Sequence, residues 1–303
     1  MPEDRVSQDV VQKRLAALPN LRSVLDDKWV AKEYEKPVEQ RSLISGRLSI
    51  DWNGLDQIYE SWSKDLDSAL GLVKNYVSND VWCVVKRKIQ AHCDRSESKG
   101  TSSEIAIWAF LAKHNVPFKL ETELIPGSNK NVDISIDLNG KESVHIEVQW
   151  LSPSDNSERG AAAASIYRGA YPYKFDYEIY RIKSKVYDKT PKLTVEDITL
   201  VALNCTVCPV LGGDRKGCSI EESILEAFTG CDSQGNPTPY VHSDIDTKIR
   251  ELVDGVIWFE LKPGGELQPE NRGVCLNPVS PHRGNLSLQK LVEMWNPSRI
   301  GCR

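Results

Sequence analysis

Two short segments in which apolar and polar residues strictly alternate constrain the fold more than any other feature of the sequence. They span residues 132–138 and 144–149. Because successive side chains of a β-strand point to opposite faces, each segment predicts a strand with one apolar and one polar face. The polar positions are Asp133, Ser135 and Asp137 in the first strand and His145, Glu147 and Gln149 in the second.

The loop between the two strands decides which polar residues face one another. A two-residue turn would place apolar side chains opposite polar ones, whereas a three-residue loop brings like faces together. A loop over 138–140 places Asp133 diagonal to Glu147, and a loop over 139–141 places them directly opposite. Either register brings the two carboxylates within about 5–8 Å of each other.

Two carboxylates at this separation repel each other and destabilise a hairpin that offers them no partner. A divalent cation that prefers oxygen ligands, such as Mg²⁺, removes the repulsion. Magnesium also retains bound waters, one of which could attack a phosphodiester. The alternative is a solvated sheet face on which both acids contribute only to solubility, because antiparallel sheets often expose one face to water.

The order of elements resembles the core of the PD-(D/E)XK phosphodiesterase superfamily: a helix with a glutamate, a strand with an aspartate, a strand with a Glu-x-Gln pattern, and a further helix. The resemblance spans about residues 101–205, in which 121–128 and 176–189 are similar to bacterial members. Residues 254–259 and 277–278 give weaker support. The resemblance implies a mixed α/β fold with a restriction-endonuclease-like core, in which helices flank a central mixed sheet.

The resemblance also implies a role for the polar residues of this core. Asp133 and Glu147 would bind Mg²⁺, for which Mn²⁺ can substitute. The third motif position is normally a lysine that orients water and stabilises charge at phosphorus. Here it is Gln149, which supplies no positive charge, although some restriction-endonuclease members resemble this pattern. Lys185 could restore the charge from the following helix, and Lys130 is a weaker candidate.

Glu104 has two interpretations. The resemblance makes it a metal or water ligand on the first core helix, whereas the local sequence fits a capping box with Thr101 as the N-cap. His145 shares the carboxylate face but is expected to be a sheet-surface residue. Arg159 and Arg168 lie in a long irregular segment and are expected to be solvated, although they could contact phosphates if that segment overlies the site.

The chain is predicted to divide into a mainly helical N-terminal region, residues 1–98, and a nuclease-like core with a C-terminal extension, residues 99–303. In the N-terminal region helical periodicity is clearest at 55–77 and 81–92. A polar joint follows at 94–103. Beyond it we expect helices at 104–114, 177–189 and 286–295, and strands at 118–124, 132–138, 143–151, 198–204, 253–261 and 274–276.

The cysteines suggest a second, weaker metal site. Cys205 and Cys208, with Cys218 and Cys231 further along, could form a structural zinc site. The second pair is irregularly spaced and no second Cys-x-x-Cys is present. Reduced, partly buried thiols are therefore favoured over zinc.

Composition limits the classes of function. The net charge of −5 argues against a general nucleic-acid coating role, because non-specific affinity comes largely from lysine and arginine, but it allows a local basic groove. No apolar run approaches the roughly 18–20 residues of a membrane-spanning helix. The polar N-terminus lacks the apolar core of a secretion signal. A cytoplasmic location without a membrane partner is therefore expected.

These observations lead to a metal-dependent DNA endonuclease as the first hypothesis. A homodimer would suit double-strand cutting, because each chain would contribute one active site. The alternative is a catalytically degenerate nuclease-like fold that binds partners without cutting, which the missing lysine and the acidic net charge favour. A zinc-containing interaction module built on Cys205 and Cys208 is a third possibility.

Overall fold

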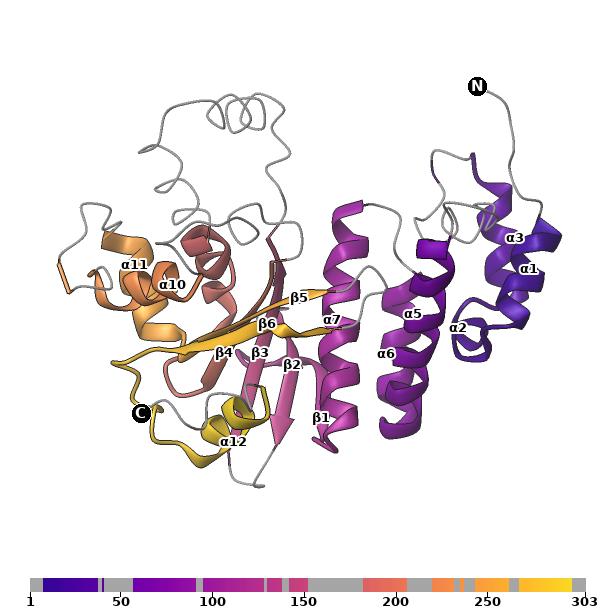
Figure 1. Ribbon diagram of the computed structural model, residues 1–303. Helices are drawn as coiled ribbons and strands as arrows, with labels where there is room; N and C mark the ends of the chain where they lie inside the picture. The colour runs from indigo at the N-terminus through magenta and orange to yellow at the C-terminus, as the bar shows by residue number, and fades with distance from the viewer. Residues whose placement is uncertain are drawn as a thin grey trace, which may run out of the picture. The chain divides into compact units, whose positions relative to one another are not determined.

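The computed structural model describes the following residues: 8–37, 40, 57–90, 95–127, 130–137, 142–151, 182–205, 220–231, 235–236, 243–261 and 267–295. The chain forms two compact units (Figure 1). The first consists of Met1–Pro117 with Leu261–Gln268, and the second of Phe118–Glu260 with Pro269–Arg303. Within the described ranges, no helix is long and apolar enough to cross a membrane.

The first unit contains the helices α1 (Gln8–Ala16), α2 (Pro19–Val24), α3 (Asp27–Glu35), α5 (Gln57–Tyr76), α6 (Asn79–Gln90) and α7 (Arg95–Lys113). The two helices predicted from periodicity are confirmed as α5 and α6. On α5, Leu66, Leu70 and Val73 recur at helical spacing and are buried. The buried carboxylate of Asp67 accepts a hydrogen bond from the Leu21 amide at 2.7 Å, which satisfies a free N–H in the first turn of α2.

Helix α7 differs from the prediction at its N-terminal end. It begins at Arg95, so the segment predicted as a polar joint is largely helical. Thr101 therefore lies inside the helix, and the capping box with Thr101 as N-cap is wrong. The side chains of Thr101 and Ser103 are buried, and this tertiary packing outweighs the weak helix propensity of the segment. Helix α7 packs on α5, which places Glu104 in the first unit.

The second unit is built on a mixed sheet, and the predicted mixed α/β class is confirmed. The described strands form one sheet in sequence order, with β1–β2–β3 antiparallel and β3–β4–β5 parallel. The strands are β1 (Phe118–Glu123), β2 (Asn131–Asp137), β3 (Ser143–Trp150), β4 (Ile198–Asn204), β5 (Gly255–Leu261) and β6 (Leu267–Leu276). All correspond to predicted strands, although β6 begins seven residues before its predicted start at residue 274.

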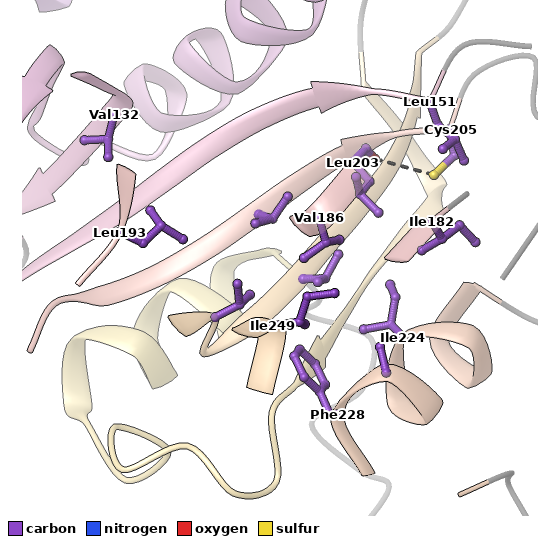
Figure 2. Packing of buried hydrophobic residues seen from close by; sticks show 14 residues of the cluster. Val132, Leu151, Ile182, Val186, Leu193, Leu203, Cys205, Ile224, Phe228 and Ile249 are labelled. Atoms are coloured by element: carbon purple, nitrogen blue, oxygen red, sulfur yellow. Dashed lines mark hydrogen bonds between the residues drawn. The ribbon is translucent and has the colours of Figure 1, made fainter. Parts of the chain in front are cut away.

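The core of the second unit surrounds β4, in which every residue is buried. A parallel strand covered on both faces is expected to be mainly apolar, and in β4 only Thr199 and Asn204 are polar. One face of the sheet packs on a helical segment at 182–187, on α10 (Ile220–Thr229) and on α11 (Ser243–Leu252). Figure 2 shows Val186 close to Leu203 of β4, with Ile249 and Phe228 further from that strand. Helix α12 (Leu286–Trp295), which has the predicted bounds, places Trp295 against Phe259 of β5.

A buried hydrogen-bond network fixes the start of β4 and β5. The Asp254 carboxylate accepts from the Thr199 amide at 2.6 Å and from the Ser280 hydroxyl. Asn277 donates its side-chain amide to the carbonyls of Arg250 and Val253 at 2.8 and 2.9 Å. The Asn277 backbone amide donates to the Asp254 carbonyl at 2.8 Å, so the two late segments that gave weaker support to the family resemblance are joined to each other.

We expect Asp254→Asn to destabilise the protein by about 1–3 kcal/mol, because the amide cannot accept both hydrogen bonds of the buried carboxylate. Burial raises the pKa of Asp254, against the hydrogen bonds from Ser280 and Thr199 and the charge of His282, which lower it. A raised carboxyl pKa gives a contribution to stability that is complete below the ordinary pKa and is lost as the pH rises through the folded-state pKa.

The cost of Asp254→Asn should therefore be larger near pH 4 than near pH 7. Urea unfolding of the wild type and the variant at both pH values measures this difference. A cost that grows with pH would contradict the assigned direction of the pKa shift.

Candidate functional site

The register of β2 against β3 brings the two predicted metal ligands face to face. Ser135 pairs with His145, and the ladder runs to Ile134 and Ile146. One residue further along each strand, Asp133 lies opposite Glu147. This is the register expected for the three-residue loop at 139–141, although the loop itself lies outside the described residues.

Where the hydrogen-bond ladder between β2 and β3 ends, the two carboxylates accept hydrogen bonds from backbone amides. The Asp133 amide donates to Oε1 of Glu147 at 3.2 Å, and the Val148 amide donates to Oδ2 of Asp133 at 2.8 Å. Each acidic side chain is therefore tied to the neighbouring strand, which fixes the separation of the two carboxylates. Glu147 is fully buried, and the side chain of Asp133 is 16% exposed.

Two lysines complete a cluster of four charged groups. The Lys189 ammonium lies 3.1 Å from Oε2 of Glu147 and 3.5 Å from Oδ2 of Asp133. The Lys192 ammonium lies 3.0 and 3.3 Å from the two oxygens of Glu147 and donates to the Asn131 carbonyl at 3.0 Å. The side chains of the lysines are 15% and 24% exposed, so the cluster is accessible at its cationic edge.

A short 3₁₀ helix, η2 (Thr190–Lys192), positions both lysines. It follows the helical segment at 182–187 and has Pro191 in its first turn. The Thr190 side chain is buried and donates its hydroxyl to the Tyr187 carbonyl at 2.9 Å. Since Thr190 anchors the turn from inside, Lys189 and Lys192 on either side of it both reach the carboxylates.

Burial dominates the electrostatics of Glu147. It raises the pKa of the carboxyl, the charge of Asp133 raises it further, and the lysine ammonium groups oppose both effects. Two negative and two positive groups thus form a cluster that is balanced in charge. A carboxyl with a raised pKa beside a second carboxylate is the arrangement that divalent cation binding relieves.

The other residues predicted for the site have partners outside the cluster of four charged groups. Gln149 is half-buried and donates to the carbonyl of its neighbour Trp150 at 3.4 Å. Lys185 pairs with Asp188 at 3.7 Å on the surface, so the lysines that reach the carboxylates are not the one expected. Glu104 is paired with Lys88 in the first unit.

His145 is buried, so the expectation of a sheet-surface histidine is wrong. Its Nδ1 lies 2.8 Å from the Ser135 hydroxyl, and its Nε2 lies 3.6 Å from Oδ1 of Asp197. Burial lowers the pKa of His145, whereas Asp197 raises it. The polar face of the hairpin is therefore not solvated at Ser135, His145 and Glu147, because residues after the helical segment at 182–187 cover it there.

The remaining predictions concern arginines and cysteines. Arg159, Arg168, Cys208 and Cys218 lie outside the described residues. Cys205 is buried in the core of the second unit and its thiol lies 3.6 Å from the Leu203 carbonyl (Figure 2). The zinc site thus stays an untested prediction.

The donor set of the cluster is compatible with magnesium. In the part of the chain that is described, no group of three or more histidine, cysteine, aspartate or glutamate residues could hold a metal ion. A closed zinc site needs four such ligands, but Mg²⁺ is commonly held by one or two carboxylates together with waters and substrate phosphates. Asp133 and Glu147 satisfy that requirement.

The sequence carried only a weak signal for the two lysines. The segment Lys189-Thr-Pro-Lys192 places two cations around a proline directly after a predicted helix and shortly before a buried strand.

Comparison of the chain with protein-family models, with curated proteins and with solved structures gave no match.

Proposed function

We propose that the protein is a Mg²⁺-dependent phosphodiesterase that cleaves DNA as an endonuclease, with a restriction-endonuclease-like core of the PD-(D/E)XK kind. The observation that carries this proposal is the pairing of Asp133 with Glu147 on adjacent strands, within 3.5 Å of two lysine ammonium groups. Acidic ligands for a cation and fixed positive charge for a phosphate are the two requirements of phosphodiester hydrolysis.

In this proposal the carboxylates of Asp133 and Glu147 hold the metal ion. Bound Mg²⁺ supplies Lewis acidity toward a phosphate oxygen and lowers the pKa of a coordinated water. Lys189 and Lys192 supply the positive charge that Gln149 lacks and stabilise the negative charge that develops at phosphorus. Hydrogen bonds from the Asp133 and Val148 amides keep both carboxylates in place during the reaction.

Cleavage assays with plasmid and single-stranded DNA test the proposal. The wild type, Asp133→Ala and Glu147→Ala are compared in Mg²⁺ and in Mn²⁺. We expect cleavage by the wild type alone, and none when EDTA replaces the metal. Equal cleavage by all three proteins would contradict the assignment of Asp133 and Glu147 as metal ligands. Gel filtration of the wild type tests the homodimer proposed for double-strand cutting.

The lysines offer a sharper test because the same short segment contains a matched control. We expect Lys189→Met and Lys192→Met each to lower the rate of cleavage by about 10²-fold, the usual effect of removing one electrostatic stabiliser of a transition state. Lys185→Met removes the same charge from the surface pair with Asp188 and should leave the rate unchanged.

Single-turnover cleavage at saturating protein measures all three variants. An equal loss in Lys185→Met would show that general charge, and not the cluster, determines the rate.

One observation favours the second candidate, a nuclease-like fold that binds without cutting. The two ammonium groups already balance the two carboxylates, so the cluster does not need a metal ion to be neutral. The two candidates differ in a thermal-shift experiment. A rise in melting temperature with Mn²⁺ that Glu147→Ala abolishes supports the nuclease, whereas no rise supports the non-catalytic fold.

A further inference from the structure

A second candidate site lies in the first unit, between α3 and α6. A cavity of about 430 Å³ is lined by Trp29, Lys32, Glu33, Lys36, Cys83, Lys86, Arg87 and Gln90. Ligand pockets commonly range from about 300 to 1,000 Å³, so this volume accommodates more than an inorganic phosphate ion.

The lining residues come from two matching helical stripes. On α3 and the residue that follows it, they occupy positions i, i+3, i+4 and i+7 from Trp29. On α6 they occupy the same positions from Cys83. Residues with this spacing lie on one side of a helix, so two helix faces turn toward each other and form the walls of a groove.

The groove is locally basic in a chain whose net charge is −5. Among the described residues, four cationic side chains line it against one carboxylate, that of Glu33. Glu33 is 2% exposed and pairs with the Lys36 ammonium at 2.6 Å, so Lys36 neutralises the charge of this carboxylate. Lys32 and Arg87 are exposed and Lys86 is half-buried. The lining residues that the structure describes therefore carry a net positive charge, which attracts an anion with more than one negative charge.

The groove also contains an aromatic side chain in a fixed orientation. Trp29 is half-buried, and its indole N–H donates to the Gln90 carbonyl at 3.5 Å. The Gln90 side chain in turn donates to the Val24 carbonyl, which links the end of α6 to the end of α2. An indole held among cations is the combination that single-stranded nucleic-acid sites use, with phosphates on the cations and a base on the ring.

We propose that this groove binds a single-stranded segment of nucleic acid, with its phosphates on Lys32, Lys86 and Arg87 and a base against Trp29. The proposal rests on the proposed function only for the choice of nucleic acid as the ligand. A lipid headgroup shares the phosphate but would need apolar side chains that enter the bilayer. In the described residues the exposed large hydrophobic side chains are Leu72, Val195, Val279 and Leu286, and none of them lines the groove.

The test measures binding of a short fluorescent single-stranded oligonucleotide by anisotropy, in EDTA and over a range of salt concentrations up to about 0.15 M. We expect Lys86→Glu to weaken binding by about tenfold and to reduce the dependence of log K on log salt by about one ion. Lys13→Glu makes the same change of charge at an exposed position of α1 and should alter the affinity by less than about twofold. Equal losses in the two variants would overturn the groove as the site.

The thiol of Cys83 reports on the wild type, so the result does not depend on how a variant folds. Cys83 is exposed and lines the groove. We expect the oligonucleotide to slow alkylation of Cys83, measured on its peptide by mass spectrometry, without slowing that of Cys231. Protection of Cys83 by tripolyphosphate or by anionic phospholipid vesicles to the same degree would assign the groove to that ligand and overturn the proposal.

The outcomes also separate this proposal from the nuclease. Both measurements are made without a divalent metal, so neither depends on cleavage. Binding by the wild type without cleavage would support the groove and contradict the nuclease. Cleavage by the wild type, together with unchanged oligonucleotide binding by Lys86→Glu, would support the nuclease and contradict the groove.

Discussion

Glu147→Gln is expected to reduce Mg²⁺-dependent DNA cleavage by about 10³-fold. The amide retains the shape of the side chain, and its one oxygen can still accept from the Asp133 amide and from Lys192, but it cannot supply the negative charge that binds a divalent cation. A metal ion contributes several kcal/mol of charge stabilisation to such a transition state, and each 1.36 kcal/mol corresponds to a factor of ten in rate.

Single-turnover cleavage with excess protein measures this loss, and the melting temperature shows whether the variant is folded. Asp133→Asn should produce a loss of the same order. Asp137→Asn is the matched control, because Asp137 is an exposed acid at the end of the same strand. A comparable loss in Asp137→Asn, or an unchanged rate in Glu147→Gln, would contradict the role assigned to the carboxylate pair.

The largest effect on stability is expected for Lys183→Met, at about 3–5 kcal/mol. The Lys183 side chain is fully buried, and its ammonium lies 3.3 Å from carboxylate oxygens of both Glu226 and Asp246. The three residues come from the helical segment at 182–187, from α10 and from α11. Removing the ammonium leaves two carboxylates close together in the core with no countercharge.

Urea unfolding measures the cost, with Lys185→Met as the control. Lys185 lies two residues further along the same segment in a surface pair with Asp188, and such pairs contribute about 0–1 kcal/mol. A triple variant, Lys183→Met with Glu226→Gln and Asp246→Asn, should recover part of the lost stability because no buried charge remains. A loss in Lys183→Met as small as that in Lys185→Met would show that the buried carboxylates do not need the ammonium.

This buried ion cluster also bears on the candidate site. The helical segment that Lys183 anchors continues into η2, which carries Lys189 and Lys192 to the carboxylates. A partly folded Lys183 variant should therefore lose cleavage together with stability. Among variants of the four charged groups at the candidate site, only those that retain the wild-type melting temperature report on the chemistry.

The arrangement of Asp133 and Glu147 was predictable because strand alternation and loop length are local properties of the sequence. Alternation assigned the two residues to one face, and the even register followed from keeping apolar faces together. The strand β4 and the helix α12 were predictable for a related reason, since a continuous apolar run and a clear helical periodicity do not depend on distant residues.

The covering of the polar face was not predictable from the same pattern. Alternation shows that His145 and Glu147 share a face but not what packs on it. The cover comes from residues about 40 positions later in the chain, so the sequence alone left a solvated face as an alternative. The lysines were missed for the same reason, because Lys189 and Lys192 reach Glu147 from a 3₁₀ turn that strand register does not describe.

Helix α7 shows the opposite error, in which a local sequence pattern gave a wrong prediction because distant packing outweighs it. The polar residues before Glu104 resemble a joint and a capping box, yet α7 begins at Arg95 and buries Thr101 and Ser103. Glu104 then pairs with Lys88, both within the first unit. Its role as a ligand rests on the family resemblance and stays a prediction.

A crystal soaked in Mn²⁺ and measured for anomalous scattering tests the metal centre most directly. The proposal predicts a peak between the carboxylates of Asp133 and Glu147, with the ammonium groups of Lys189 and Lys192 moved away from the oxygens that bind the ion. A map without a peak there at saturating Mn²⁺, in which both lysines still contact Glu147, would contradict it.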